Sequence, residues 1–251
     1  MEWLGELLSL PAGDALEIAL IVFIAGLVRG FAGFALTALV MAGGAMILPP
    51  VQLLPVCWFL ELTASALMTR GGIRAGERDV ALWLVVMSAL GQPVGYWLTT
   101  TLPVETSRLV ALSLVVALAL AQLVRLRLPW LATRPGLMTT GALAGLSTGL
   151  AGVGGMVVAL YVLARNAPAA AMRGTLVLFL VLGSITGLTM LSLFGLMTAE
   201  AATRGLILAV PAALGVVLGA RLFTERLARW YRLFCLALLV GMAATSLMRA
   251  G

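Results

Sequence analysis

One arginine, Arg29, lies inside an otherwise apolar run at residues 26–34. A charge in such surroundings costs free energy, and it usually marks a functional site. A guanidinium can donate two parallel hydrogen bonds, a geometry that suits a small tetrahedral or pyramidal oxyanion. Residues 145–155 repeat the glycine spacing 119 positions later (145 − 26), with Thr148 in the place of Arg29. The two stretches predict one anion site that is built twice.

Arg29 has three interpretations that the sequence leaves open. It binds an anion, it pairs with Glu61, or it extends toward the cytoplasmic surface as a snorkelling side chain. Glu61 lies near the centre of its own apolar run, where a carboxylate is costly unless it is paired or protonated. Glu61 is therefore predicted either to form a structural ion pair or to couple transport to protons.

Interrupted helices provide the rest of the predicted site. A helix break leaves backbone N–H groups whose partial positive charge favours anions, and glycines let a ligand approach that backbone. Residues 152–155 are glycine-rich enough for such a cradle, whereas Phe34, Ala35 and Leu36 interrupt the cluster in the first copy. The predicted substrate-binding residues are Arg29, Gly30, Gly33, Thr37, Ser65, Gln92, Ser147, Thr148, Gly152, Gly154, Gly155 and Ser184. Gln92 is placed in a predicted break at Gly91-Gln-Pro-Val-Gly95 that resembles Val210-Pro211.

The same small residues also have a purely structural interpretation. Glycines spaced four apart let two membrane helices pack closely, which is the commoner role of such pairs. We favour this role away from the breaks, and exposed faces of this kind are also compatible with a homodimer. The sets concerned are Gly26/Gly30, Gly91/Gly95, Gly141/Gly145/Gly149 and Gly215/Gly219.

The composition of the chain indicates whether it folds in water or in a lipid bilayer. Of 251 residues, 62% are hydrophobic and only 10% are charged, and the mean hydropathy is +1.13. A water-soluble domain could not bury so much apolar surface, so the chain is predicted to be an integral membrane protein. Two-residue alternation is absent and the apolar runs are long, which predicts an all-α polytopic fold.

The apolar runs differ in length. Two are too short to cross about 30 Å of hydrocarbon, since residues 35–48 span only about 21 Å as a helix. We expect these two to be broken or re-entrant helices near the centre of the fold. The predicted segments are 16–32, 35–48, 51–69, 80–100 and 108–124, followed by 137–152, 155–164, 172–192, 203–222 and 231–248.

The segments form two repeats of about five, predicted as residues 1–128 and 129–251. Gly33 and Gly152 correspond at a spacing of 119, and Gly91 and Gly215 correspond at 124. An insertion of five residues in the second repeat, placed between Leu193 and Thr203, explains the shift. Because each repeat crosses an odd number of times, the two are predicted to be inverted relative to each other.

Arginine placement supports this topology. Excluding Arg29, threading the segments puts twelve arginines on one side and three on the other, and the arginine-rich side is predicted to be cytoplasmic. Both termini then face the periplasm. The acidic residues near the N-terminus are unlike a cleavable signal, so we expect them to stay in the mature chain. The three arginines outside are Arg108, Arg204 and Arg249.

Several classes of function are excluded or disfavoured. Gly145-Leu-Ser-Thr-Gly149 fits the nucleophile elbow of serine hydrolases, but the chain has no histidine to act as the base. The lack of histidine also argues against zinc and di-iron sites, and no Walker loop is present. We therefore expect no enzyme, no cofactor and no metal. The arginines do not form a stripe with aromatic residues, so no nucleic-acid partner is expected.

The duplicated Gly-x-x-x-Gly-x-x-Gly stretches resemble the TauE/SafE sulfite exporter family. Each stretch precedes a short apolar limb and a proline, and residues 145–155 and 215–219 fit the same pattern. The resemblance covers essentially the whole chain. It implies a permease of the bacterial inner membrane for small sulfur-containing anions such as sulfite or an organosulfonate.

The sequence thus predicts export of a small anion by alternating access at a central site. The partners implied are the anion and the lipid bilayer. One rival prediction is a proton-coupled carrier of another small metabolite that uses Glu61. The other is a membrane scaffold that transports nothing.

Overall fold

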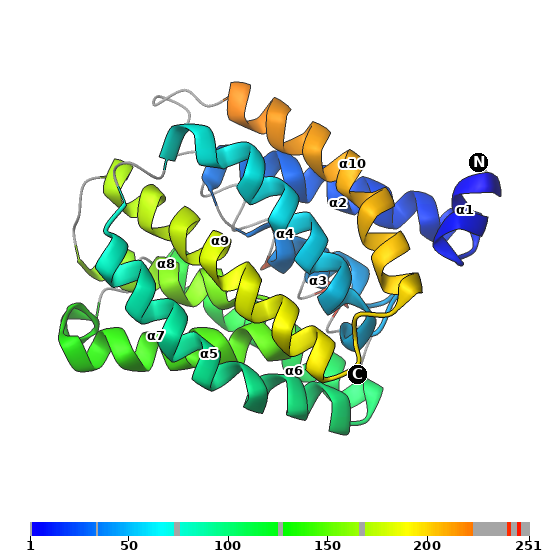
Figure 1. Cartoon of the computed structure of the whole chain (residues 1–251). Coiled ribbons are helices and arrows are strands. Elements are labelled where there is room, and N and C mark those ends of the chain that lie inside the picture. Colours follow the sequence, from blue (N-terminus) through cyan, green and yellow to red (C-terminus); the bar gives the residue numbers. More distant parts are fainter. Residues whose placement is uncertain are drawn as a thin grey trace.

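The structure is a computed structural model that describes residues 2–33, 35–72, 76–124, 128–165, 169–222, 240–241 and 245–246. In these ranges every regular element is a helix, as predicted (Figure 1). A short 3-10 helix, η2 (Pro129–Ala132), lies between α6 and α7 in the chain. The α-helices are α1 (Glu2–Leu8), α2 (Ala12–Ala32), α3 (Leu36–Gly44), α4 (Pro50–Gly72), α5 (Arg78–Thr101), α6 (Val104–Leu123), α7 (Arg134–Ala151), α8 (Gly154–Ala164), α9 (Ala169–Leu193) and α10 (Ala199–Arg221).

Five described helices, α4, α5, α6, α9 and α10, are long and apolar enough to cross a membrane. They confirm a multi-pass membrane protein. The helix α1 was not predicted, and α2 begins four residues earlier than expected. The predicted last span, 231–248, lies almost entirely outside the described residues.

The two short limbs are confirmed. Helix α3 has 9 residues and α8 has 11. At 1.5 Å per residue these are about 14 and 17 Å long, which is too short to cross the hydrocarbon.

Each limb follows a helix that ends in the same way. Helix α2 ends at Gly33 (φ 83°), and α7 ends at Gly152 (φ 70°). This left-handed conformation suits glycine, which has no Cβ to clash. The N–H of Gly33 donates to the Arg29 carbonyl, and that of Gly152 donates to the Thr148 carbonyl. The predicted helix breaks are therefore confirmed at two positions that are 119 residues apart.

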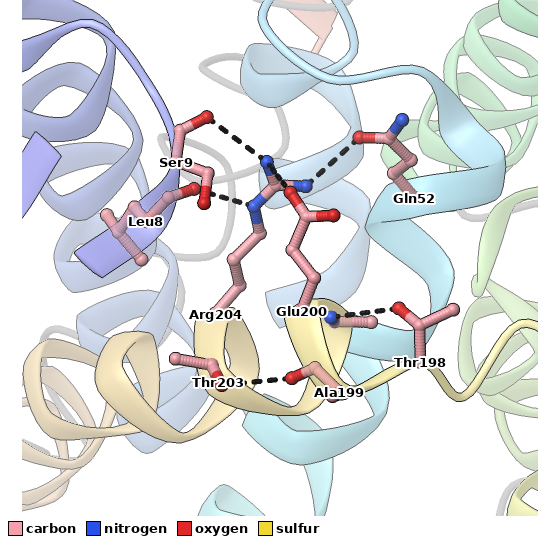
Figure 2. A network of polar contacts seen from close by, with 9 residues as sticks. Leu8, Ser9, Gln52, Thr198, Ala199, Glu200, Thr203 and Arg204 are labelled. Atoms are coloured by element: carbon pink, nitrogen blue, oxygen red, sulfur yellow. Dashed lines mark hydrogen bonds and ion pairs between the residues drawn. The ribbon is translucent and has the colours of Figure 1, made fainter. Parts of the chain in front are cut away.

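One end of the molecule is held by Arg204, at the start of α10 (Figure 2). Its guanidinium donates to the Leu8 carbonyl at 2.7 Å, the Ser9 carbonyl at 3.3 Å and the Gln52 side chain at 3.1 Å. It also forms an ion pair with Glu200 at 2.6 Å. The C-terminus of α1 and the beginnings of α4 and α10 are thereby joined, and we call this the Arg204 end.

The opposite end is marked by Arg165, just after α8. Its guanidinium forms an ion pair with Glu77 at 2.6 Å, and the Glu77 N–H donates to the Thr175 hydroxyl at 3.0 Å. These contacts join the C-terminus of α8 to the beginnings of α5 and α9. Helices α2 and α3 thus form a hairpin that enters from the Arg204 end, and α7 and α8 form one that enters from the Arg165 end (Figure 1).

Glycines allow two pairs of helices to pack backbone against backbone. A Cβ on Gly26 or Gly30 of α2 would overlap the backbone of α10, and a Cβ on Gly145 or Gly149 of α7 would overlap that of α5. The facing helices contribute Gly215 and Gly219 on α10, and Gly91 and Gly95 on α5. The packing interpretation is confirmed for these glycines. We call the two contacts the α2/α10 seam and the α5/α7 seam.

One expectation is wrong. The chain does not break at residues 91–95 or at 210–211, because α5 runs unbroken through Pro93 and α10 runs unbroken through Pro211. Neighbouring membrane helices can accommodate the backbone groups that a proline frees, so proline does not have to end a helix there. The matched packing of α2 with α10 and of α7 with α5 is compatible with an inverted duplication, which stays a prediction.

Candidate functional site

The two helix breaks meet at the centre of the molecule. A Cβ added to Gly152 in the second break would overlap the Thr37 methyl group, which lies just after the first break. Beside this contact lies a cavity of about 80 Å³. That volume has room for several waters or for one small anion.

Six described helices and the second break line this cavity. Helix α3 contributes Thr37, α7 contributes Thr148 and the break contributes Gly152. The remaining lining residues are Leu54, Cys57, Trp58 and Glu61 of α4, Ser88, Gln92 and Tyr96 of α5, Gly155 of α8, and Phe179, Leu180, Gly183, Ser184 and Gly187 of α9. The cavity is therefore shared between the two predicted repeats.

The predicted site residues divide into two groups. Those that line the cavity are Thr37, Gln92, Thr148, Gly152, Gly155, Ser184 and Glu61. Those that do not line it are Arg29, Gly30, Gly33, Ser65, Ser147 and Gly154. Gly30 lies in the α2/α10 seam, and Gly33 caps the end of α2. A role in substrate binding stays a prediction for all of these residues.

Arg29 is fully buried behind the cavity wall. Its exposed fraction is 0%, and its Nη2 lies 3.2 Å from Oε2 of Glu61 and 3.3 Å from the hydroxyl of Ser65. Nη1 donates to the carbonyl of Gly33. Of the three interpretations, the ion pair with Glu61 is the one that this arrangement contains. Glu61 lies between the guanidinium and the cavity, with 21% of its side chain exposed.

The Glu61 carboxylate also caps the short helix α3. Its Oε1 accepts hydrogen bonds from the Thr37 hydroxyl at 3.0 Å and from the Thr37 N–H at 3.4 Å. Thr37 is the second residue of α3, where backbone N–H groups have no partner within the helix. A negative charge at this place is favoured by the helix dipole.

The second break presents an equivalent helix end without a carboxylate. Gly155 is the second residue of α8 and lines the cavity, and its N–H belongs to the first turn, where backbone N–H groups have no partner within the helix. The residue 119 positions after Glu61 (61 + 119) is Leu180, which lies against Gly155. This helix end is therefore bordered by an apolar side chain.

Polar side chains on α5 complete the cavity wall. Gln92 is 2% exposed, and its Nε2 donates to the hydroxyls of Ser88 at 3.4 Å and Thr186 at 3.1 Å. Its Oε1 is buried without a hydrogen-bond partner among the described residues. Rotating the amide would instead direct its NH₂ group toward that unpartnered position.

The hydroxyls of Thr148 and Ser184 already donate to carbonyls of their own helices. These two residues therefore offer the cavity acceptor lone pairs rather than hydrogens. An anion would have to draw their protons away from Ala144 and Val181. The donors that need no such change are the backbone N–H of Gly155 and the hydroxyls of Ser88 and Tyr96.

Sequence reasoning missed several lining residues on α4, α5 and α9. Trp58 donates from Nε1 to the Ser184 carbonyl at 2.8 Å, which ties α4 to α9 beside the cavity. Gly187 packs against the same indole ring. The spacing of four between Ser88, Gln92 and Tyr96 places all three on one helix face, and this signal could have been used. Cys57 and Gly183 carried no comparable signal.

A second cavity, of about 10 Å³, lies at the Arg165 end. It is lined by Glu77, Tyr161, Arg165 and Thr175, among others. Burial lowers the pKa of the Arg165 guanidinium, but the hydrogen bond to Glu77 raises it, and the net direction is upward. This ion pair is independent of the central cavity and offers a matched control for Glu61.

No cluster of three histidine, cysteine, aspartate or glutamate residues that could hold a metal occurs in the described ranges.

Comparison with curated proteins and with solved structures gives no match. The model of one protein family, described as sulfite exporter TauE/SafE, matches residues 18–246. The matched range includes both helix breaks, both seams and every residue that lines the central cavity. The chain therefore belongs to the TauE/SafE sulfite exporter family, which makes it a membrane transporter and not an enzyme.

Proposed function

We propose that the protein exports a small sulfur-containing anion, such as sulfite or an organosulfonate, through the bacterial inner membrane. The observation that supports this most is the meeting of two helix breaks at a polar cavity of about 80 Å³. Such broken helices near the bilayer centre form the substrate sites of many transporters that carry repeats.

In this proposal the anion binds at the beginning of α8. The N–H of Gly155 and the hydroxyls of Ser88 and Tyr96 donate to it, and Gln92 contributes its amide after rotation. In this proposal the cavity opens alternately to the cytoplasm and to the periplasm, and both termini are expected to lie on the periplasmic side. Because a membrane that is negative inside favours outward movement by about 2.3 kcal/mol per charge for every ~100 mV, export needs no further energy source.

A thermal-shift screen tests the substrate class. The purified chain is heated with sulfite, sulfate, thiosulfate, sulfoacetate or lactate, and the sulfur oxyanions should raise the unfolding temperature more than lactate does. Liposomes that contain the protein should then release labelled sulfite. The absence of both a shift and a flux would contradict the proposed substrate class and leave the proton-coupled carrier and the scaffold interpretation.

A proton-coupled carrier remains the second candidate, and a specific observation favours it. Glu61 is the one charged residue among those that line the central cavity. If the substrate is bound by Glu61, Glu61→Gln should reduce flux more than any change at the beginning of α8. The homodimer suggested by the sequence can be tested on the same preparation by its mass in detergent.

A further inference from the structure

Glu61 is held as a bound anion would be held. One carboxylate oxygen receives the N–H and the hydroxyl of Thr37, and the other lies 3.2 Å from the guanidinium of Arg29. A helix N-terminus, a hydroxyl and an arginine are together the donors that proteins use for free oxyanions. The same donors could therefore bind a free oxyanion in place of the Glu61 carboxylate.

The donors are also more numerous than one carboxylate uses. The Nε of Arg29 is buried and has no hydrogen-bond partner among the described residues, although the side chain is fully enclosed. A buried donor without a partner costs free energy. An oxyanion with three or four oxygens could approach more of these donors than the two oxygens of Glu61 do.

We propose that the first break is a second anion-binding site, and that Glu61 is its tethered occupant. A small oxyanion takes this site, beside Arg29 and Thr37, when Glu61 accepts a proton and withdraws. That this oxyanion is the transported one rests on the function proposed above. The cradle at Gly155 then belongs to the second break and the site at Arg29 to the first.

The charges balance in this exchange. With Glu61 ionised, Arg29 is neutralised and the pair carries no net charge. Protonation of Glu61 leaves one positive charge uncompensated, and a monoanion restores neutrality, so one proton is taken up for each monoanion that binds. The other titratable groups that line the cavity are Cys57, on the same helix as Glu61, and Tyr96 on α5. The described lining residues of α3, α7, α8 and α9 include no charged or titratable side chain.

Removal of the tethered carboxylate tests the proposal. In the full-length variant Glu61→Ala, added formate should refill the site and raise the unfolding temperature by about 5 °C at saturating concentration. The wild-type protein and the matched control Glu77→Ala, which lacks the carboxylate that pairs with Arg165, should not respond to formate. The double variant Arg29→Gln/Glu61→Ala should lose the response again.

An equal response to formate in Glu61→Ala and in the wild type would overturn the proposal. If Glu61→Ala cannot be purified, the proposal can be tested instead by measuring proton uptake in the wild type and in Glu61→Gln. Sulfoacetate added to wild-type protein in weak buffer near neutral pH should cause uptake of protons, and the same addition to Glu61→Gln should cause none. Binding without proton uptake in the wild type would contradict the exchange.

The two proposals fail separately. If sulfoacetate stabilises neither the wild type nor Glu61→Ala, but formate stabilises Glu61→Ala, the second site stands and the proposed substrate class is wrong. If sulfoacetate stabilises all variants alike and formate stabilises none, the cradle at Gly155 stands and the tethered role of Glu61 is wrong.

Discussion

The two helix breaks begin alike, at a glycine that ends the preceding helix, but they have different electrostatics. Each ends a helix at a glycine with positive φ, and each starts a short limb whose second residue faces the cavity. In the first break a carboxylate fills the helix end and an arginine balances it, whereas in the second a leucine borders an unfilled helix end. One backbone design can therefore be closed by its own side chain or left open for a ligand.

Introducing a carboxylate into the second break, as Glu61 provides in the first, should have the largest effect on transport. Leu180→Glu would put a carboxylate beside Gly155, where it competes with an incoming anion without an arginine to balance it. Like charges at a binding site cost several kcal/mol, so we expect anion flux in liposomes to fall about a hundredfold. Leu180→Gln has the same shape and no charge, and it should retain most of the flux. Equal flux in the two variants would contradict a binding site at α8.

Breaking the ion pair of the first break should mainly affect stability. Arg29→Gln removes a fully buried charge and leaves Glu61 without its partner, and we expect a loss of about 3–5 kcal/mol in the free energy of unfolding. The double variant Arg29→Gln/Glu61→Gln should recover part of this loss, because no charge is then left unpaired. Denaturant unfolding in detergent measures both. A double variant no more stable than Arg29→Gln would mean that the pair is not the main contribution.

Gly152 gives a smaller and more local test. Gly152→Ala should lose about 1–2 kcal/mol to its positive φ, and in addition it places a methyl group against Thr37 in the cavity. Gly195→Ala is the matched control, since Gly195 has φ 68° and open space around it. Both variants should lose stability through their backbone, and only Gly152→Ala should also lose anion binding in the thermal-shift assay. A similar loss of binding in Gly195→Ala would show that the effect is not local.

The smallest effect is expected at Ala35, which starts α3 with φ 74°. A non-glycine residue in this conformation costs about 1–2 kcal/mol, and glycine loses somewhat less than this to its greater freedom in the unfolded chain. Ala35→Gly should therefore stabilise the protein by about 0.5 kcal/mol, and Gly154→Ala at the corresponding position should not. A destabilised Ala35→Gly would indicate that the alanine methyl group packs better than this estimate assumes.

Much of the fold could be predicted because it depends on the lipid environment, which sets the length of the apolar runs, and on the spacing of glycines. Apolar length separated the long helices from α3 and α8, and the glycine spacing located both breaks. The predicted break at Gln92 was wrong because a proline removes only one backbone hydrogen bond of a helix. Neighbouring helices can satisfy the backbone group that is left without a partner.

The cavity could be predicted only in part. Its glycines and hydroxyls near the breaks were identified, and so was Ser184 on α9, but Gly183 and Gly187 of α9 were not, since they also fit an ordinary packing face. For Arg29 the three alternatives could be derived from the sequence, but the choice among them could not. Whether a buried arginine contacts a ligand or a glutamate depends on how α2 and α4 are placed, and local spacing carries no such information.

The two glycine seams determine which parts of the protein can move as rigid bodies. In each seam a helix encoded early in the chain packs against one encoded late, with backbone touching backbone. Separating the first 128 residues from the rest would have to open both seams at once. We therefore expect composite mobile units, with α1, α2, α4 and α10 in one and α5, α7, α8 and α9 in the other. A rocking motion of these units would strain the contact of α4 with α9, where the indole of Trp58 donates to the Ser184 carbonyl.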